Sequence, residues 1–192
     1  KKILENGGSK VSINSNALAN PEFINKVVNI FGSSVVSVSI DVGKINSKYY
    51  AFSVGGRECS GKDPVNWAKE AEERGAGEII LTSIENEGAG KGYNLDLIKK
   101  ISSSVGIRVI ANGGVGNIDN IFDLFDKTKA GAASMASILH YSLLKKNNKF
   151  RGYDEEGSHA FLMKKNFNFK KFENFFIQDI KDKLKKKNIN IR

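Results

Sequence analysis

The sequence is poor in cysteine and histidine, and each shortage argues against a class of protein. Among its 192 residues Cys59 is the only cysteine, so the chain has neither a disulfide framework nor a cluster of thiolate metal ligands. A lone cysteine is typical of a reducing compartment, and we therefore expect a cytoplasmic protein. The two histidines, His140 and His159, are more typical of capping or packing residues than of catalysts. Because no metal-ligand spacing is present, we expect no metal and no other cofactor.

Long apolar runs are absent as well. No stretch approaches the ~20 apolar residues that a membrane helix requires, and the first residues lack the apolar core of a secretory signal. We therefore expect no membrane association. With 40% hydrophobic residues, the chain is long enough to build one well-cored domain.

Basic residues exceed acidic ones, but the excess is uneven. The formal net charge is +9, yet residues 1–140 hold 16 Lys and Arg against 15 Asp and Glu. Residues 141–192 hold 14 against 6. A solvated helix face or tail explains such a Lys-rich end better than a phosphate-backbone patch, so nucleic acid is not an expected partner.

Strand-like and helix-like segments alternate along the chain, which is the pattern of an α/β protein. Five βα units in series, without a dinucleotide-binding fingerprint, indicate a (βα)8 (TIM) barrel that is incomplete here. The remaining three strands are expected before residue 1, since a closed barrel has eight. The expected strands cover 10–13, 34–40, 78–83, 108–111 and 132–136, with a hairpin arm at 49–54. The expected helices cover 21–31, 64–73, 95–104, 118–127 and 175–187.

The alternation of strand-like and helix-like segments, and the place where it stops, divide the chain into three parts. Residues 1–141 are the partial barrel, and residues 177–192 are its last helix and tail. Residues 142–176 form a polar and then phenylalanine-rich insertion of unknown role. Packing explains those aromatic side chains better than base stacking does.

The stretch VIANGGVGN, residues 109–117, places three glycines where an apolar strand ends and a helix begins. Glycine costs conformational entropy on folding, so three of them suggest that something approaches the backbone closely. We interpret Gly113 and Gly114 as residues whose amides bind a phosphate oxygen at a helix N-terminus. An ordinary strand-to-helix turn, in which glycine only supplies a positive φ, explains one such loop equally well.

The ends of the other strands carry further candidates, because chemistry in a parallel barrel occurs at the carboxyl ends of its strands. Asp41 directly follows an apolar strand and is the candidate general acid or base. Spacing alone favours a helix cap or an ion pair for this residue. Glu85 and Glu87 resemble a carboxylate pair, but an acidic loop at a helix entrance is the simpler explanation.

Several long stretches together match the pattern of one known family. They are KVSINSNALANPEFI (10–24), VVSVSID (35–41), WAKEAEERGAGEIILTSIENEGAGKGYNLDLI (67–98), VIANGGVG (109–116), ASMASILHY (133–141) and DIKDKLKKKNINIR (179–192). They closely resemble the cyclase subunit of imidazole glycerol phosphate synthase. The resemblance covers about residues 1–141 and 177–192, whereas residues 142–176 are longer than the family pattern.

The resemblance implies a function in histidine biosynthesis, with this chain holding barrel strands four to eight. The family forms a heterodimer with a glutaminase subunit that docks at the amino-terminal face of the barrel and delivers ammonia. It converts a phosphorylated ribulosyl formimino intermediate into imidazole glycerol phosphate and an aminoimidazole carboxamide ribotide. Asp41 matches the catalytic aspartate of strand five, which serves acid–base steps of cyclisation.

The resemblance also implies roles for residues around that aspartate. Asn14 and Ser15 match positions near one substrate phosphate, and Thr82 matches the pocket wall. Lys10 and Glu78 match charged residues at the opposite mouth of the barrel, where ammonia enters; an ordinary surface ion pair is the alternative. The second phosphate site is matched by Gly88, Gly114, Ala136 and Ser137.

Three departures from the family pattern bear on activity. The family's first catalytic aspartate and a neighbouring lysine belong to strand one, which this sequence lacks, so we expect little or no cyclase activity from the chain alone. The family's SIDRDGT loop is SIENEGA at residues 83–89, which lengthens two carboxylate side chains and removes a hydroxyl beside the phosphate. Gly55 stands where the family has a serine in its flexible arm.

Two other functions stay open at this point. A paralogous branch that amidinates sugars for surface polysaccharides also fits stretches such as KDPVNWAKEAEE, residues 62–73. The chain is alternatively a non-catalytic binding protein, either for a phosphorylated ligand or for nucleic acid through residues 142–192.

Overall fold

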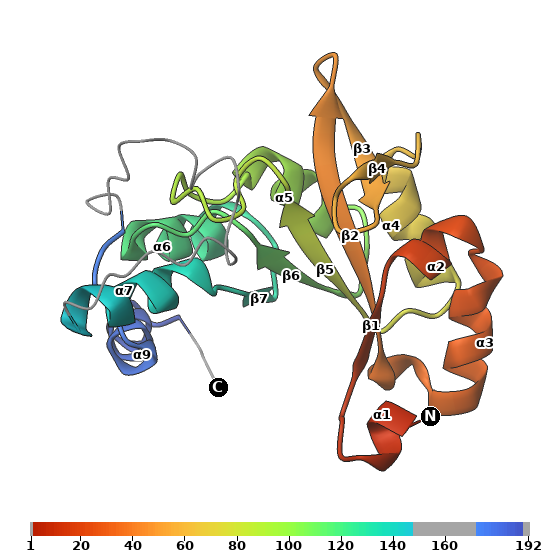
Figure 1. Ribbon diagram of the computed structural model, residues 1–192, viewed down its shortest axis with the longest axis horizontal. Helices are drawn as coiled ribbons and strands as arrows, with labels where there is room; N and C mark the ends of the chain where they lie inside the picture. The colour runs from red at the N-terminus through yellow and green to blue at the C-terminus, as the bar shows by residue number, and fades with distance from the viewer. Residues whose placement is uncertain (1, 148–171, 190–192) are drawn as a thin grey trace.

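A curved and mostly parallel sheet forms the centre of the molecule, with helices packed against it (Figure 1). The computed structural model describes residues 2–147 and 172–189. Five parallel strands lie side by side in sequence order: β1 (Val11–Ile13), β2 (Val36–Ile45), β5 (Glu78–Ser83), β6 (Arg108–Asn112) and β7 (Ala132–Ala133). This order confirms the expected incomplete barrel, since β1 and β7 are not paired with each other in the described part of the chain.

A helix follows each parallel strand, as the βα pattern predicts. The helices are α1 (Lys2–Glu5), α2 (Ser15–Ala19), α3 (Glu22–Phe31), α4 (Pro64–Glu73), α5 (Leu95–Ser102), α6 (Ile118–Lys127), α7 (Ser137–Asn147) and α9 (Ile177–Lys186), with a short 3-10 turn at Ser33–Val35. Their first turns are fixed locally. Asp63 accepts hydrogen bonds from the amides of Val65 and Asn66 at the start of α4, and Asn117 forms a capping box with Asn120 at the start of α6.

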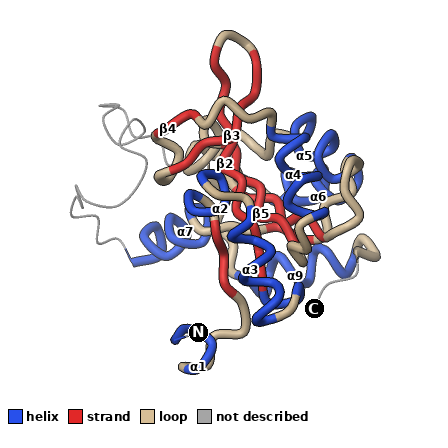
Figure 2. The backbone as a smooth tube through the Cα atoms, turned by 90° about the vertical axis from the view of Figure 1, so that its right-hand side faces the viewer, coloured by secondary structure: helices blue, strands red, loops and turns tan. Residues whose placement is uncertain are grey.

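The expected arm is an antiparallel hairpin, and it extends β2 further than the sequence predicted. β3 (Lys48–Ser53) pairs with residues 41–45 of β2, and β4 (Glu58–Cys59) pairs with β3. The strand therefore continues through Asp41 instead of ending before it. Figure 2 shows the β2–β3 hairpin extending beyond the other strands at one end of the sheet.

Two further differences concern the end of the barrel segment. β7 covers only Ala132–Ala133, shorter than the strand expected at 132–136, because the next residues turn directly into α7. Helix α7 was not predicted, and it runs through residue 141 as far as Asn147. Most of the expected insertion, 148–171, lies outside the described residues.

The core lies between the strands and the helices that cover them. Ile40, Leu81 and Val109 on neighbouring strands are at most 1% exposed, and Trp67 and Ile121 pack against them from α4 and α6. Each such side chain contributes roughly 1.5–3 kcal/mol when it is fully buried. Val38 and Ile40 of β2 and Leu81 of β5 share one buried face, whereas Ser37, Ser39 and Asp41 of β2 project from the other. Because a slip of one residue would exchange these two faces, the apolar set holds the parallel sheet in a single register.

A small ionic cluster lies at the amino ends of the central strands. The Nζ atom of Lys10 bonds Glu78 Oε2, and Ser37 Oγ donates to Glu78 Oε1 at 2.6 Å. The Lys10 side chain is 45% exposed, whereas that of Glu78 is only 8% exposed. Burial opposes ionisation of Glu78, but the hydrogen bonds from Lys10 and Ser37 outweigh it, so the pKa of Glu78 lies below its ordinary value.

We predict that Lys10→Met destabilises the fold by about 1–3 kcal/mol at neutral pH, because it leaves a nearly buried carboxylate without its cation. A depressed pKa stabilises the fold above the unfolded-state value of 4.5 and loses that contribution as the pH falls through the folded-state value. The cost of the substitution should therefore shrink in acid. Urea unfolding at about pH 7 and about pH 3 measures both free energies.

Lys127→Met is the matched control, since Lys127 and its partner Asp123 are 52% and 44% exposed. An exposed pair of this kind contributes less than about 1 kcal/mol. Equal losses in the two variants would contradict a specific role for the buried pair.

Candidate functional site

Strand register brings three polar side chains into one row near the carboxyl ends of the central strands. Asp41 on β2 is the register partner of Thr82 on β5, which in turn is the partner of Asn112 on β6. In-register side chains of neighbouring parallel strands project from the same face of a sheet. Asn112 Nδ2 donates to Thr82 Oγ1 at 3.2 Å, and Thr82 also hydrogen-bonds the Asp41 carboxylate.

Asp41 is half-buried and well supported by neighbouring donors. Asn14 Nδ2, from the end of β1, donates to Asp41 Oδ2 at 3.0 Å. Burial raises the pKa of the Asp41 carboxyl, and the hydrogen bonds from the side chains of Thr82, Ser39 and Asn14 offset only part of this effect. A carboxyl with a raised pKa exchanges protons more readily near neutral pH, as acid–base catalysis requires.

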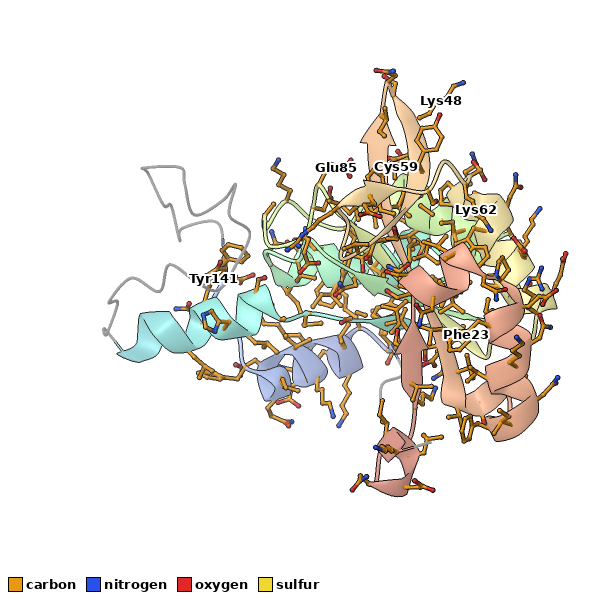
Figure 3. The ribbon with its side chains drawn as sticks, turned by 45° about the vertical axis from the view of Figure 1, so that its right-hand side comes forward. Phe23, Lys48, Cys59, Lys62, Glu85 and Tyr141 are labelled. Atoms are coloured by element: carbon orange, nitrogen blue, oxygen red, sulfur yellow. The ribbon has the colours of Figure 1, made fainter. Side chains whose placement is uncertain are left out.

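Glu87 is a second carboxyl at this site, although its sequence context had favoured an acidic loop at a helix entrance. Asn112 Nδ2 donates to Glu87 Oε2 at 3.2 Å, so the amide of Asn112 links Glu87 with Thr82. Burial and the nearby charge of Asp41 raise the pKa of Glu87. Its neighbour Glu85 instead accepts a hydrogen bond from the Lys44 amide in the hairpin, at 2.6 Å, and lies toward that arm (Figure 3).

The Asp41 pocket, as we call this cavity, has a volume of about 410 Å³. Its walls come from β2, β5, the loop that follows β5, the hairpin arm and α7, from which Tyr141 projects (Figure 3). The lining residues are Asp41, Gly55, Gly56, Thr82, Ile84, Glu87, Gly88, Ser137 and Tyr141. The structure therefore brings four predicted site residues together in one cavity: Asp41, Thr82, Gly88 and Ser137.

A second and much narrower hollow of about 10 Å³ lies beside the Asp41 pocket, between the glycine-rich strand ends. Among the residues that line it are five of the predicted phosphate-binding residues: Gly88, Gly113, Gly114, Ala136 and Ser137. Gly88 and Ser137 line both cavities, so the glycine hollow opens next to the Asp41 pocket. Helix α7 begins at Ser137, which places the positive end of its dipole at the glycine hollow.

The glycines of VIANGGVGN are required mainly because two loops touch each other. Gly113 and Gly114 have φ angles of 90° and 113°, which other residues rarely adopt. A Cβ atom on Gly114 would lie 2.1 Å from the carbonyl oxygen of Gly92, and the Gly92 amide donates to the Gly114 carbonyl at 2.7 Å. The close approach inferred from the sequence is thus made by the loop after β5.

Three predicted residues, Ser15, Lys10 and Glu78, line neither the Asp41 pocket nor the glycine hollow. Ser15 Oγ accepts a hydrogen bond from the Val54 amide at 2.9 Å, which ties the hairpin arm to the start of α2. Lys10 and Glu78 lie at the amino ends of β1 and β5, at the opposite end of the sheet from Asp41. They belong to a different cluster from the Asp41 pocket.

A wider hollow of about 740 Å³ lies along β7, between α6 and α9. Its lining is mostly apolar, with Phe125, Met135 and Ile180 among the side chains and Arg108 and Lys181 also present. Its lining residues include neither a carboxyl side chain nor a residue of the two glycine loops. Because it borders the unpaired edge of β7, we attribute it to the openness of the sheet and not to ligand binding.

Two features of other kinds of protein are absent from the described residues. In residues 2–147 and 172–189 no three His, Cys, Asp or Glu side chains converge as metal ligands. None of the helices in these same ranges is both long enough and apolar enough to span a bilayer.

The fold and the site together define a (βα)-barrel protein with a candidate ligand site at the carboxyl ends of its strands. Residues 1–145 match the model of the histidine biosynthesis protein family, and the chain belongs to that family. This confirms the family resemblance that the sequence motifs carried.

Curated relatives make the similarity more specific. One is the "Imidazole glycerol phosphate synthase subunit HisF" of Lactococcus lactis subsp. cremoris MG1363, 49% identical over 144 residues, which cover 73% of this chain and 55% of the relative. The protein of the same name from Prochlorococcus marinus subsp. pastoris CCMP1986 is 45% identical over 141 residues, covering 72% and 55%. The chain thus spans about half the length of the curated relatives it matches.

We predict that Asp41→Asn raises the melting temperature at neutral pH, because ionised Asp41 is partly buried at a cost to the folded state. A raised acid pKa means that this cost develops as the pH rises from the unfolded-state value of 3.8 through the folded-state value. The gain in the variant should therefore be full at about pH 8 and absent below about pH 3.5. Thermal unfolding followed by circular dichroism measures it.

Asp96→Asn serves as a control, because Asp96 is exposed in the first turn of α5. It should show no gain at any pH. A lower melting temperature for Asp41→Asn at neutral pH would show that Asp41 stabilises the fold and would contradict the prediction.

Proposed function

We propose that this chain acts in the cyclase subunit of imidazole glycerol phosphate synthase, supplying one phosphate site and one acid–base carboxyl. In that reaction ammonia from a glutaminase partner converts the ribulosyl formimino intermediate into imidazole glycerol phosphate and an aminoimidazole carboxamide ribotide. One observation carries the proposal: Asp41 lines the same pocket as Gly88 and Ser137, beside the N-terminus of α7. The names of the relatives support the same activity.

The substrate's phosphate would lie at the mouth of the glycine hollow. A hollow of about 10 Å³ holds no more than about one water molecule, so the anion cannot lie wholly inside it. At the mouth it would meet the first amides of α7, where the helix dipole favours negative charge. Because Gly88 and Ser137 also line the Asp41 pocket, the rest of the substrate would extend toward Asp41.

Asp41 would then exchange protons with the reacting part of the substrate. Its raised pKa suits this role, and hydrogen bonds from Thr82 and Asn14 fix its orientation. Asn14 Oδ1 is buried and meets no donor among the described side chains and backbone groups. That oxygen is therefore suited to accept a hydrogen bond from a substrate hydroxyl or N–H group.

The amino ends of the strands would face the glutaminase partner. The Lys10–Glu78 pair lies there, at the far ends of the strands that carry Asn14 and Thr82. Ammonia delivered at this end would reach Asp41 along the strands, without passing through the opening used by the phosphorylated substrate.

We predict that Asp41→Asn lowers turnover by about 10²–10⁴-fold, the usual contribution of a general acid or base. The assay joins this chain to the first three βα units of the Lactococcus relative, supplies ammonia, and follows product formation. Binding of glycerol 3-phosphate should change by less than about threefold, since the phosphate contacts backbone amides and not Asp41. The chain alone should bind the phosphate ester without turnover.

The joined protein with Asp96→Asn is the control and should retain its rate. Unchanged turnover in Asp41→Asn would remove the acid–base assignment. Failure of the unmodified chain to bind glycerol 3-phosphate would remove the phosphate site.

Glu87 makes phosphate binding depend on pH. Its carboxyl shares the glycine hollow and the Asp41 pocket, so an ionised Glu87 would repel the phosphate. Because the pKa of Glu87 is raised, this repulsion should develop as the pH rises above the ordinary value of 4.5 and through the raised one. We predict that Glu87→Gln binds glycerol 3-phosphate about tenfold more tightly at about pH 8 and loses most of this dependence.

Glu85→Gln is the matched control for calorimetric titration across that pH range, since Glu85 bonds the Lys44 amide in the hairpin. It should follow the wild-type curve. An unchanged pH dependence in Glu87→Gln would show that Glu87 does not face the bound anion.

A further inference from the structure

The second described range begins at Phe172, and its first two residues contact α7 at Tyr141 and the start of α6 at Ile118. Residues 172–176 lead from there into α9, and we call them the strap. Phe172 is only 2% exposed, so the strap buries an aromatic ring at its first described position.

The Phe172 ring contacts two parts of the candidate site. Its centroid lies 4.7 Å from the ring of Tyr141 on α7, with the planes inclined at 48°. On another side the ring edge touches Gly90, where an added Cβ atom would lie 2.9 Å from Phe172 Cζ. Tyr141 lines the Asp41 pocket, and Gly90 belongs to the loop between Gly88 and Gly92.

The next residue of the strap connects to the second glycine loop. The Glu173 amide donates to the Gly116 carbonyl at 2.8 Å, and the Glu173 carboxylate accepts from the Ile118 amide at 3.3 Å. Gly116 in turn packs on Gly90, since a Cβ on Gly116 would lie 2.4 Å from the Gly90 carbonyl oxygen. The strap therefore touches both loops that form the glycine hollow.

We infer that Phe172 is a positioning residue: its ring holds Tyr141 and the loop after β5 so that the glycine hollow and the Asp41 pocket keep their shapes. The positioning of Tyr141 and of the loop by the Phe172 ring does not depend on any ligand. The effect of Phe172 on ligand binding rests on the proposed phosphate site. The Phe172 side chain carries no titratable group and takes no part in proton transfer.

Ordinary core packing is the competing explanation, and Phe175 distinguishes the two. It belongs to the same strap and is 4% exposed, so its truncation leaves a comparable cavity. Its contacts lie elsewhere: its amide donates to Ser142 Oγ at 3.0 Å, and Lys183 Nζ lies 4.2 Å from its ring centroid.

The experiment compares Phe172→Ala, Phe172→Leu and Phe175→Ala in the whole chain. Two quantities are measured: the Kd for glycerol 3-phosphate by calorimetry, and the hydrogen-exchange rate of the Gly92 amide by NMR. That amide bonds the Gly114 carbonyl across the two loops, so its exchange reports their separation. Urea unfolding gives the global stability of each variant.

Phe172→Ala should weaken phosphate binding about tenfold and accelerate Gly92 exchange about tenfold beyond the change expected from global stability. Phe172→Leu should restore most of the phosphate affinity and most of the protection of the Gly92 amide, because leucine refills the space against Gly90. Phe175→Ala should lose similar global stability while both site measurements stay within about twofold of wild type.

Equal site effects from Phe172→Ala and Phe175→Ala would overturn the inference, as would unchanged Gly92 exchange in Phe172→Ala. If Phe172→Ala binds phosphate as tightly as wild type while its Gly92 amide exchanges faster, Phe172 positions the loops but phosphate binding does not depend on them. That result would overturn the predicted effect on ligand binding. If the wild-type chain binds no phosphate, the proposed function fails, and Gly92 exchange still decides the role of Phe172.

Discussion

The register between β2, β5 and β6 is the constraint on which the candidate site depends. It aligns Asp41, Thr82 and Asn112 in one row, and through Asn112 it also holds Glu87. A shift of one residue between these strands would turn every side chain to the other face of the sheet. The buried apolar side chains gather on the opposite face of these strands and oppose that shift, so the hydrophobic core determines which polar groups meet.

The glycine loops form the second element of the site, and they depend on each other as much as on any ligand. Gly92 and Gly114 are joined by a hydrogen bond of 2.7 Å, and the strap packs behind them. This mutual packing fixes the two glycine loops without any ligand, so in the proposed function little ordering would be left for binding to bring about. Two carboxyls with raised pKa values stand next to the glycine hollow. In the proposed function, the site would therefore combine attraction for a phosphate with groups that hold or release protons.

Sequence reasoning predicted the parts of this arrangement that follow from periodicity. The order of the parallel strands, the position of Asp41 near a carboxyl end and the use of glycine at Gly113 and Gly114 were visible in local patterns. The family match of residues 1–145 agrees with that fold. The assignment of the site residues to a substrate stays a prediction.

Other features depend on contacts between distant segments, and the sequence could not show them. Glu85 and Glu87 are two residues apart in one loop, and only the fold directs the first to the hairpin and the second to Asn112. β2 continues past Asp41 because β3 pairs with it, which is a long-range effect. Phe172 was one of a series of phenylalanines, and nothing local distinguishes it from Phe175.

The most direct test of the account follows backbone amides by NMR while glycerol 3-phosphate is added to the isotopically labelled chain. The account predicts that the amide signals of Gly88, Gly113 and Ser137 shift together with one Kd, and that the side-chain carboxyl carbon of Asp41 responds at the same concentrations. Shifts confined to the Lys-rich helix α9, with the glycine loops and Asp41 unchanged, would contradict it.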